Sequence, residues 1–399
     1  MHLKSVLPEE IILEIFSKIE QDELKKLLEI SQEWRDLLIK NVEVMRKLPL
    51  ILMNETWREK IRFVQNYGKY IREVKFVDTE IESFEEMETI LRLTPNIEKL
   101  SLLRVKLPEK EENSEENPED ENVEESFICE KIKLKKLCKL SVEDETNVGS
   151  LNFIATNCEA VKLTSLKCDV NSKDQQKIVE RILTDNRQLK SLEIATTLDA
   201  LFDPDDEIIE QFTCRLEKIS FTSIVMHYNE QFVKFLKSQK RVKELGILGS
   251  HVDFRYHQMM FTTFPSVRKI CLNIDAISTT DCLVKIKKTP ANRSIQSLTL
   301  MGRNLHLNVF DSILRLCPKI HHLEIENLTQ FYSNKIRILP LTHLKVDFGR
   351  TENLKPENFS QSTKIEMIEN LQSAYERNLQ SYCDLNCVVK KNREILEAF

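Results

Sequence analysis

The chain has 399 residues, of which 41% are hydrophobic and 31% charged, with 6 glycines, 11 prolines and a formal net charge of −6. This composition excludes a largely disordered chain and allows a large buried core or several domains. No run of residues approaches the ~18 apolar residues that a membrane-spanning helix needs, so no membrane partner is expected.

The amino-terminal residues lack the pattern of a secretory signal, because Pro8, Glu9 and Glu10 stand where its apolar core would be. The ten cysteines are scattered, without clustered pairs. Without a signal, this spacing favours reduced thiols over a disulfide framework. We therefore expect a cytoplasmic and/or nuclear protein.

Residues 5–40 are predicted to form three short helices. Pro8 suits a first helical turn, and the acids that follow it favour the positive end of the helix dipole. Asp22 and Ser31 are candidate caps for the second and third helices. So small a domain has a marginal core, yet it carries more large apolar residues than it can easily hide. Some of them are expected to contact a partner; the alternative is that they pack on the rest of the chain as a capping unit.

Residues 71–349 repeat the pattern apolar-x-x-apolar-x-apolar. Eleven copies begin at residues 71, 97, 137, 163, 189, 216, 242, 267, 295, 320 and 341. The last two apolar positions of each copy alternate with polar ones, which predicts a strand with one buried face. Amphipathic segments such as 84–93 lie between the copies and predict helices. Because a strand–loop–helix unit cannot bury its apolar face alone, stacked units are expected to share one core.

The period of this pattern resembles that of leucine-rich repeats, which are ~20–29 residues long with L-x-x-L-x-L at their core. The steps between successive copies are 21–28 residues, apart from one step of 40. Most copies lack the Asn or Cys that the family has after the last Leu. The resemblance implies an α/β solenoid of horseshoe shape, with a parallel sheet inside and helices outside.

The one long step contains an acid-rich segment at 108–126. Within it, residues 109–126 hold ten acids and one lysine, so the rest of the chain is close to neutral. With Val123 as its one aliphatic residue, this segment cannot bury enough surface to fold. We expect a disordered insertion into one repeat; an acidic partner-binding loop is the alternative.

The residues near the amino terminus carry a second resemblance. The pattern is Leu7-Pro8-x-Glu10-Ile11-x-x-x-Ile15-Phe16, then Asp22-x-Leu24, then Ile30-Ser31-x-x-Trp34-Arg35-x-Leu37. Its order and spacing resemble those of an F-box. An F-box followed by leucine-rich repeats is similar to the F-box/leucine-rich-repeat family, and the resemblance covers nearly the whole chain.

The resemblance implies a role for each part. In this family the F-box binds a Skp-type adaptor, which joins a cullin and a RING subunit in an SCF ubiquitin ligase, and the repeats hold the substrate protein. The chain would then be the substrate-recognition subunit in proteasomal degradation and not itself an enzyme. The expected adaptor contacts are Leu7, Pro8, Ile11, Ile15, Phe16, Leu24, Leu27, Leu28 and Trp34. The alternative is a leucine-rich protein-binding scaffold that acts outside a ubiquitin ligase.

Substrate contacts are expected at strand positions that alternate with the buried ones, because these face the inner side of the solenoid. The expected set is Lys218, Ser220, Leu248, Lys269, Asn273, Met301, His322, Glu324, His343 and Lys345. Leu248 and Met301 are its apolar members and candidate anchors for a substrate peptide. The charges at these positions form no stripe of one sign, so no nucleic-acid partner is expected.

No catalytic, cofactor or metal site is predicted. His321 and His322 are neighbours on an expected strand and point to opposite faces, so they cannot bind one ion. Cys383 and Cys387 have no second pair nearby, which disfavours a zinc site.

The predicted order of domains is an F-box, a helical linker or cap, the repeats and a helical tail. Their boundaries are 1–45, 46–70, 71–349 and 350–399, with the acidic insertion at 108–126. In the tail, apolar residues recur at helical spacing from Ile368 to Tyr382, which predicts a helix that caps the last repeat.

Overall fold

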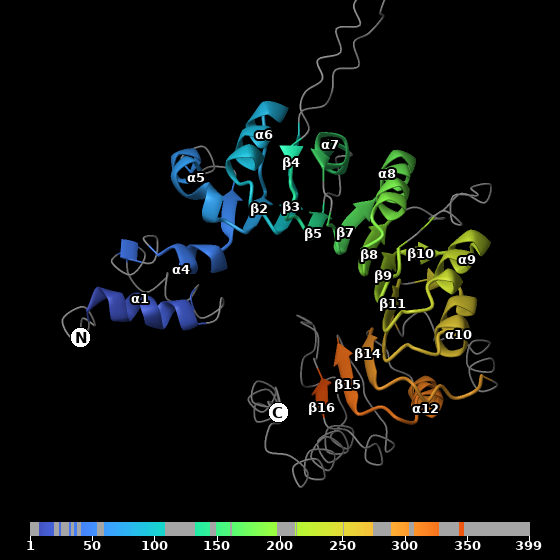
Figure 1. Cartoon of the computed structure of the whole chain (residues 1–399). Helices are drawn as coiled ribbons and strands as arrows, with labels where there is room; N and C mark the ends of the chain where they lie inside the picture. The colour runs from blue at the N-terminus through green and yellow to red at the C-terminus, as the bar shows by residue number, and fades with distance from the viewer. Residues whose placement is uncertain are drawn as a thin grey trace, which may run out of the picture. The chain divides into compact units, whose positions relative to one another are not determined.

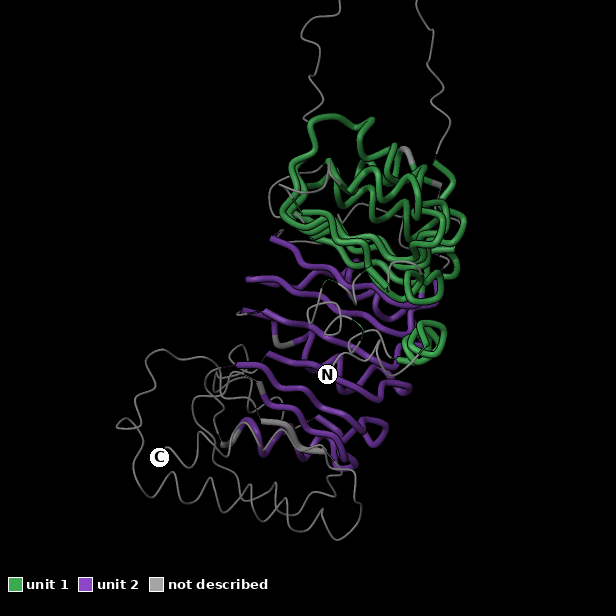
Figure 2. The backbone as a smooth tube through the Cα atoms, turned by 90° about the vertical axis from the view of Figure 1, so that its left-hand side faces the viewer, with its two compact units in different colours: residues 1–189 green, residues 190–399 purple. Residues whose placement is uncertain are grey.

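The protein is an α/β chain of parallel strands and intervening helices, seen in a computed structural model (Figure 1). The structure describes residues 8–19, 24, 32, 36–37, 41–53, 60–107, 132–143, 149–159, 162–197, 212, 214–249, 251–273, 289–302, 307–326 and 343–346. The chain divides into two compact units, residues 1–189 (unit 1) and 190–399 (unit 2), coloured separately in Figure 2. The acidic insertion and the predicted tail helix lie outside the described residues.

Unit 1 contains a parallel sheet that begins after two helices. The helices are α1 (Glu9–Lys18) and α4 (Val42–Lys47). Neighbouring strands of the sheet are β1 (Leu50–Met53), β2 (Glu73–Val77), β3 (Lys99–Leu103), β5 (Lys139–Glu143) and β7 (Ser165–Val170). A shorter pair is formed by β4 (Ile132–Lys133) and β6 (Cys158–Glu159). Between the strands lie α5 (Ile61–Tyr67), η2 (Gly68–Tyr70), α6 (Phe84–Leu93) and α7 (Gly149–Asn157), and α8 (Lys173–Asp185) follows β7.

Unit 2 repeats the same alternation of strand and helix. Its parallel sheet has the order β8 (Ser191–Thr196), β9 (Lys218–Ser223), β11 (Glu244–Leu248), β13 (Lys269–Asn273), β14 (Ser297–Met301), β15 (His322–Glu326) and β16 (His343–Val346). The short strands β10 (Val225–Met226) and β12 (His251–Val252) pair beside it. The described helices are α9 (Glu230–Ser238), α10 (Phe254–Thr262) and α12 (Leu307–Leu316).

The core of each unit lies between its sheet and its helices, as the repeated pattern predicts. All eleven predicted strands are present, each starting two residues after its copy of the motif. In the ten copies whose side chains are described, all three apolar residues are buried, as in Ile97, Leu100 and Leu102. The other side chains of each strand point away from the helices. We call this surface the open face of the unit.

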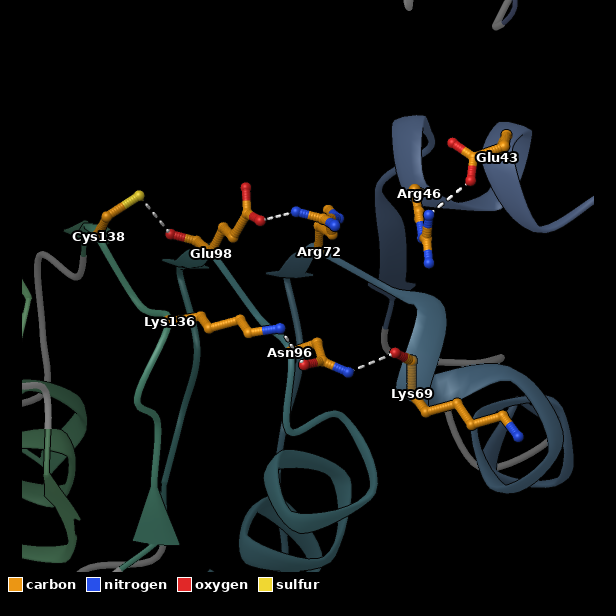
Figure 3. A network of polar contacts seen from close by, with 8 residues as sticks. All are labelled: Glu43, Arg46, Lys69, Arg72, Asn96, Glu98, Lys136 and Cys138. Atoms are coloured by element: carbon orange, nitrogen blue, oxygen red, sulfur yellow. Dashed lines mark hydrogen bonds and ion pairs between the residues drawn. The ribbon is translucent and has the colours of Figure 1, made fainter. Parts of the chain in front are cut away.

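A repeated backbone contact holds the amino-terminal ends of neighbouring strands in register. The carbonyl of Arg72 accepts hydrogen bonds from the backbone N–H groups of Glu98 (2.7 Å) and Lys99 (3.0 Å). The carbonyl of Glu98 does the same for Cys138 and Lys139, and in unit 2 the carbonyl of Glu217 does it for two residues of the next repeat. Figure 3 shows the side chains at this edge, where Arg72 pairs with Glu98 and Lys136 donates to Asn96. These contacts align equivalent positions of successive strands into rows across the sheet.

One expectation about the linker is corrected. Residues 46–70 were expected to be helical, but they include strand β1, which pairs with β2 at the edge of the unit 1 sheet. Leu50 and Leu52 are buried like the strand residues of every repeat. Residues 50–53 are all apolar, so they lack the alternation that marks the other strands. The motif fits them at Leu48, Ile51 and Met53, one residue out of the register of the other copies, in which Lys47 takes the first position.

Local capping and helix length are seen in the described part of the chain. A capping box formed by Ser172 and Gln175 begins α8. None of the described helices is long and apolar enough to cross a membrane.

Candidate protein-binding surfaces

Helix α1 presents a pair of exposed isoleucines on a face that its own core does not use. Ile11 and Ile15 are 43% and 45% exposed, and they stand four residues apart, so they are neighbours on the helix surface. Ile12 and Phe16, on the other side, are buried together with Leu24. The helix is therefore two-sided: one apolar face packs within unit 1 and the other faces outward.

Contacts with α4 fix α1 in place. The side chain of Asn41 caps α4 by accepting from the Glu43 and Val44 backbone, and it donates to the carbonyl of Leu13 in α1. Lys47 donates from Nζ to the carbonyls of Ser17 (2.5 Å) and Ile19 (3.0 Å), which are orphan acceptors at the end of α1. The exposed isoleucines thus belong to a helix held by packing and by caps.

The predicted adaptor contacts divide into three groups in the structure. Pro8, Ile11 and Ile15 lie on the exposed side of α1. Phe16 and Leu24 are 2% and 0% exposed and contribute to the core, so in this arrangement they support the helix from within. Leu7, Leu27, Leu28 and Trp34 lie outside the described residues.

The open face of unit 2 brings the predicted substrate residues together in rows. Strand register places Lys218, Glu244, Lys269, Ser297 and His322 side by side in one row. The next row holds Ser220, Gly246, Cys271, Thr299 and Glu324. Beyond it, Leu248 stands beside Thr222 and Asn273 beside Met301. His343 and Lys345 continue the first two rows by backbone position, and their side chains lie outside the described residues.

Several polar groups of this face are already engaged with one another. Lys218 pairs with Glu193 at 2.5 Å. Burial would raise the pKa of the Glu324 carboxyl, but hydrogen bonds from Thr299 (3.1 Å) and His322, with the nearby Lys269 charge, outweigh it and lower that pKa. The carboxylate of Glu324 is therefore held ionised in the middle of the face.

Gly246 stands in the middle of the second row of unit 2, where its neighbours Ser220 and Cys271 leave little space for a side chain. A Cβ at Gly246 would stand 3.1 Å from Ser220 Oγ and 3.5 Å from Cys271 Cβ. Among the described residues, no group of three or more His, Cys, Asp or Glu could hold a metal ion. What the face offers is hydrogen-bonding and charged groups spread over several strands, which suits a bound protein segment.

The open face of unit 1 was not among the predicted contacts and has a different character. Four lysines stand on it, one each from β2, β3, β5 and β7: Lys75, Lys99, Lys139 and Lys167. Ile51 and Met53, on β1, are 40% and 48% exposed. The alternation of the motif predicts that the lysines point outward, so they could have been found from the sequence. The exposed β1 residues were missed because residues 50–53 are all apolar and show no alternation.

Comparisons with known proteins leave the family of the chain open. No family model matches it, and no curated protein matches it. Among solved structures, the chain is similar to the crystal structure of the Rad7 and Elc1 complex in yeast, with a TM-score of 0.45 and 13% sequence identity. The match covers 87% of this chain and 90% of that chain. At this identity and TM-score, the likeness does not contribute to the proposal below.

Proposed function

We propose that the chain is the substrate-recognition subunit of an SCF-type ubiquitin ligase. In this proposal, α1 binds a Skp-type adaptor through its exposed face, and the adaptor brings the cullin and RING subunits. The sheet faces bind the substrate protein. The chain itself supplies binding and placement, and the chemistry of ubiquitin transfer belongs to other subunits.

The observation that carries the proposal is the exposed pair Ile11 and Ile15. A poorly packed helix would expose all of its apolar residues alike. In α1, by contrast, Ile12 and Phe16 are only 3% and 2% exposed. Full burial of an exposed aliphatic side chain is worth about 1.5–3 kcal/mol. Because Ile11 and Ile15 are 43% and 45% exposed, a partner that covers them could gain roughly half of that for each. Such a pair marks a surface that a protein partner covers.

The charges beside the pair are compatible with docking. Glu14 and Lys18 form an i, i+4 ion pair at 2.8 Å, and the hydrogen bond from Lys18 lowers the pKa of the Glu14 carboxyl. They therefore neutralise each other at the rim of the apolar pair, and covering that rim would leave no unbalanced charge from these two residues.

The proposal is tested by the affinity of the purified chain for a Skp-type adaptor, measured by isothermal titration calorimetry. The double variant Ile11→Glu, Ile15→Glu should bind at least about tenfold more weakly, because it places two charges in the contact. Both side chains are exposed, so its melting temperature should stay close to that of the wild type. The matched control is Ile224→Glu, which changes an isoleucine that is 67% exposed in unit 2 and should leave adaptor affinity unchanged.

Two results would contradict the proposal: a wild-type chain that does not bind the adaptor, or a double variant that binds as well as the control. If the adaptor binds, transfer of ubiquitin to a captured partner in a reaction with cullin, RING subunit and ubiquitin-conjugating enzyme separates a ligase subunit from a scaffold. A scaffold would form the complex and leave the partner unmodified.

A further inference from the structure

The exposed aliphatic residues of β1 begin an apolar corner on the open face of unit 1. Register places Met53 beside Val77 and Val77 beside Leu103, and it places Ile51 beside Lys75. Val77 and Leu103 are half-buried, whereas Ile51 and Met53 are exposed. We call Ile51, Met53, Val77 and Leu103 the apolar corner. Three neighbouring strands contribute to it, so it is a continuous patch and not one stray side chain.

A group of lysines adjoins the apolar corner and has too few acids to balance it. Lys99 and Lys139 are register partners on adjacent strands, and Lys75 stands one strand closer to the corner. The carboxylate of Glu73 pairs with both Lys75 (3.0 Å) and Lys99 (3.4 Å). The side-chain ammonium group of Lys139 has no hydrogen-bond or ion-pair partner within the described part of unit 1. One carboxylate therefore pairs with two of these three lysines. The next carboxylate of the face, Glu143, stands beside Leu103 and pairs with Lys167 at 2.8 Å, so the three lysines keep a net positive charge.

Hydroxyl groups lie in the adjoining row. Ser101 and Ser141 are register partners, half-buried, in the row next to Lys99 and Lys139. The Ser141 hydroxyl already donates to Glu143, at 2.9 Å. Hydroxyls beside ammonium groups extend the set of donors that a carboxylate can accept from.

We propose that the open face of unit 1 binds an extended, acidic segment of a partner protein that carries one aliphatic or aromatic anchor residue. The anchor covers Ile51 and Met53 in the apolar corner, and carboxylates of the segment pair with Lys99 and Lys139. Binding of such a segment is a property of the chain alone. That the segment belongs to the ubiquitylation substrate rests on the proposed function.

The geometry sets the spacing within the segment. The path from β1 across β2 and β3 to β5 crosses three strand spacings of ~4.8 Å, or about 14 Å. Register also places Lys139 two residues along the strand from the level of Ile51 and four from that of Met53, about 7–13 Å, so the direct distance is about 16–19 Å. An extended peptide advances ~3.3 Å per residue, so about five to six residues separate the anchor from the acid that reaches Lys139. The structure does not favour one direction of the peptide, so both orders belong in the test.

The open face of unit 2 provides the contrast that assigns the acidic segment to unit 1. Its described charged positions are two lysines against three carboxylates, and Lys218 is already paired with Glu193. Glu244 is exposed and Glu324 is held ionised, so an acidic segment would meet like charges there.

The test is fluorescence anisotropy with labelled eight-residue peptides that hold a Leu anchor and two Glu residues, five and six positions away, in both orders. The comparison peptides replace Leu by Ser or Glu by Gln. We expect the Leu/Glu peptide to bind at least about tenfold more tightly than either comparison peptide. The affinity for the Leu/Glu peptide should fall as salt rises from 50 to 300 mM, because salt screens the attraction between exposed charges.

Variants of the chain locate the site. Met53→Asp, and separately the pair Lys99→Glu, Lys139→Glu, should each weaken binding at least about tenfold. The matched control Lys218→Glu, Lys269→Glu makes the same charge change on unit 2 and should change affinity less than about twofold. A chain in which residues 110–125 are replaced by Gly and Ser removes competition from the acidic run of the chain itself.

The proposal is overturned if neither the wild-type chain nor the replaced chain binds the peptides, or if the unit 2 control loses as much affinity as the unit 1 variants. It is also overturned if single-stranded DNA of twelve nucleotides displaces the peptide as well as excess peptide does, because the face would then be a general polyanion site. Adaptor affinity measured on the same preparation is independent of these results, so a failure here is distinguishable from a failure of the proposed function.

Discussion

On the open face of unit 1, four lysines share the sheet with the exposed aliphatic side chains of β1. The open face of unit 2 carries small polar groups and, among its described side chains, more carboxylates than lysines. The inward positions of the two units do not differ in this way. In both, the three apolar residues of each described repeat are buried. Packing constrains the inward positions to one pattern, and the outward positions are free to diverge, so they are where binding specificity resides.

The layer beneath the helices of unit 2 differs from that of unit 1 in its aromatic content. Phe221 and Phe232 meet edge to face with ring centroids 4.5 Å apart, and Phe232 also contacts Tyr256 at 5.5 Å. The Tyr256 hydroxyl donates to the carbonyl of His227, and burial raises its pKa to about 12. Helices α9 and α10 are thereby tied to the sheet by a group of rings, whereas in unit 1 Phe84 of α6 stacks on Phe153 of the neighbouring helix α7.

The largest expected effect comes from removing the centre of this aromatic cluster. Phe232→Ala should lower the free energy of unfolding by about 3–5 kcal/mol, because Phe232 is 1% exposed and its loss leaves a cavity. The comparison variant is Phe84→Ala in unit 1, where the ring is half-buried and stacks on Phe153 at 5.5 Å. Urea denaturation should show a clearly smaller loss of unfolding free energy for Phe84→Ala. Equal losses would mean that the aromatic cluster stabilises unit 2 no more than the Phe84–Phe153 pair stabilises unit 1.

Acid should act on unit 2 through His257. Both of its ring nitrogens lack a hydrogen-bond partner in the described residues, and burial lowers its pKa to about 4, opposed by the nearby Asp253 charge. Between pH 6.5 and 4 the unfolded state therefore binds more protons than the folded state, so stability is full above pH 6.5 and falls as the pH drops, by ~3 kcal/mol at pH 4.

The His257→Leu variant isolates this contribution from the carboxylates that titrate in the same range. The difference in unfolding free energy between pH 7 and pH 4.5 should be smaller in the variant than in the wild type by roughly 2–3 kcal/mol. An unchanged difference would show that His257 is hydrated or exposed in the folded protein. All histidines but His2 follow residue 190, so the histidine part of the acid effect is expected in unit 2.

One glycine in each unit lies so close to a neighbouring backbone carbonyl that a larger residue there should lower stability by a similar amount. A Cβ at Gly68 would stand 2.3 Å from the carbonyl oxygen of Leu93, and one at Gly249 would stand 2.3 Å from that of Ser223. We expect Gly68→Ala and Gly249→Ala each to cost about 1–3 kcal/mol in thermal or urea unfolding. Gly246→Ala, whose nearest neighbour is the Ser220 side chain at 3.1 Å, is the milder control.

The smallest expected effects are those of the helix caps. Ser172 accepts from the Gln175 backbone at the start of α8 in unit 1, and Asn229 accepts from the Phe232 backbone at the start of α9 in unit 2. Ser172→Ala and Asn229→Ala should each cost about 1 kcal/mol. Similar losses of unfolding free energy, measured by calorimetry, would show that helix caps contribute equally in the two units, although the open faces of the units differ. A loss of several kcal/mol at one cap would contradict this.

Most of the fold could be predicted from the sequence, because the same three apolar positions recur in every repeat and each recurrence is independent evidence for a strand. Strand β1 could not, because its four residues are all apolar and the motif fits them one residue out of register. The apolar stripe of α1 was visible, but its division into buried Ile12 and Phe16 and exposed Ile11 and Ile15 depends on where α4 packs. Pairings such as Lys218 with Glu193 require the register between strands, which no single repeat specifies.

The most direct test asks whether the two exposed apolar surfaces of unit 1, on α1 and on β1, bind different partners. Adaptor affinity and acidic-peptide affinity would be measured on the wild type, on Ile11→Glu, Ile15→Glu, and on Met53→Asp. The account predicts that the α1 variant loses the adaptor and keeps the peptide, that the β1 variant does the reverse, and that the adaptor-bound wild type still binds the peptide. Loss of both partners by one variant that retains its melting temperature, or retention of both by each variant, would contradict it.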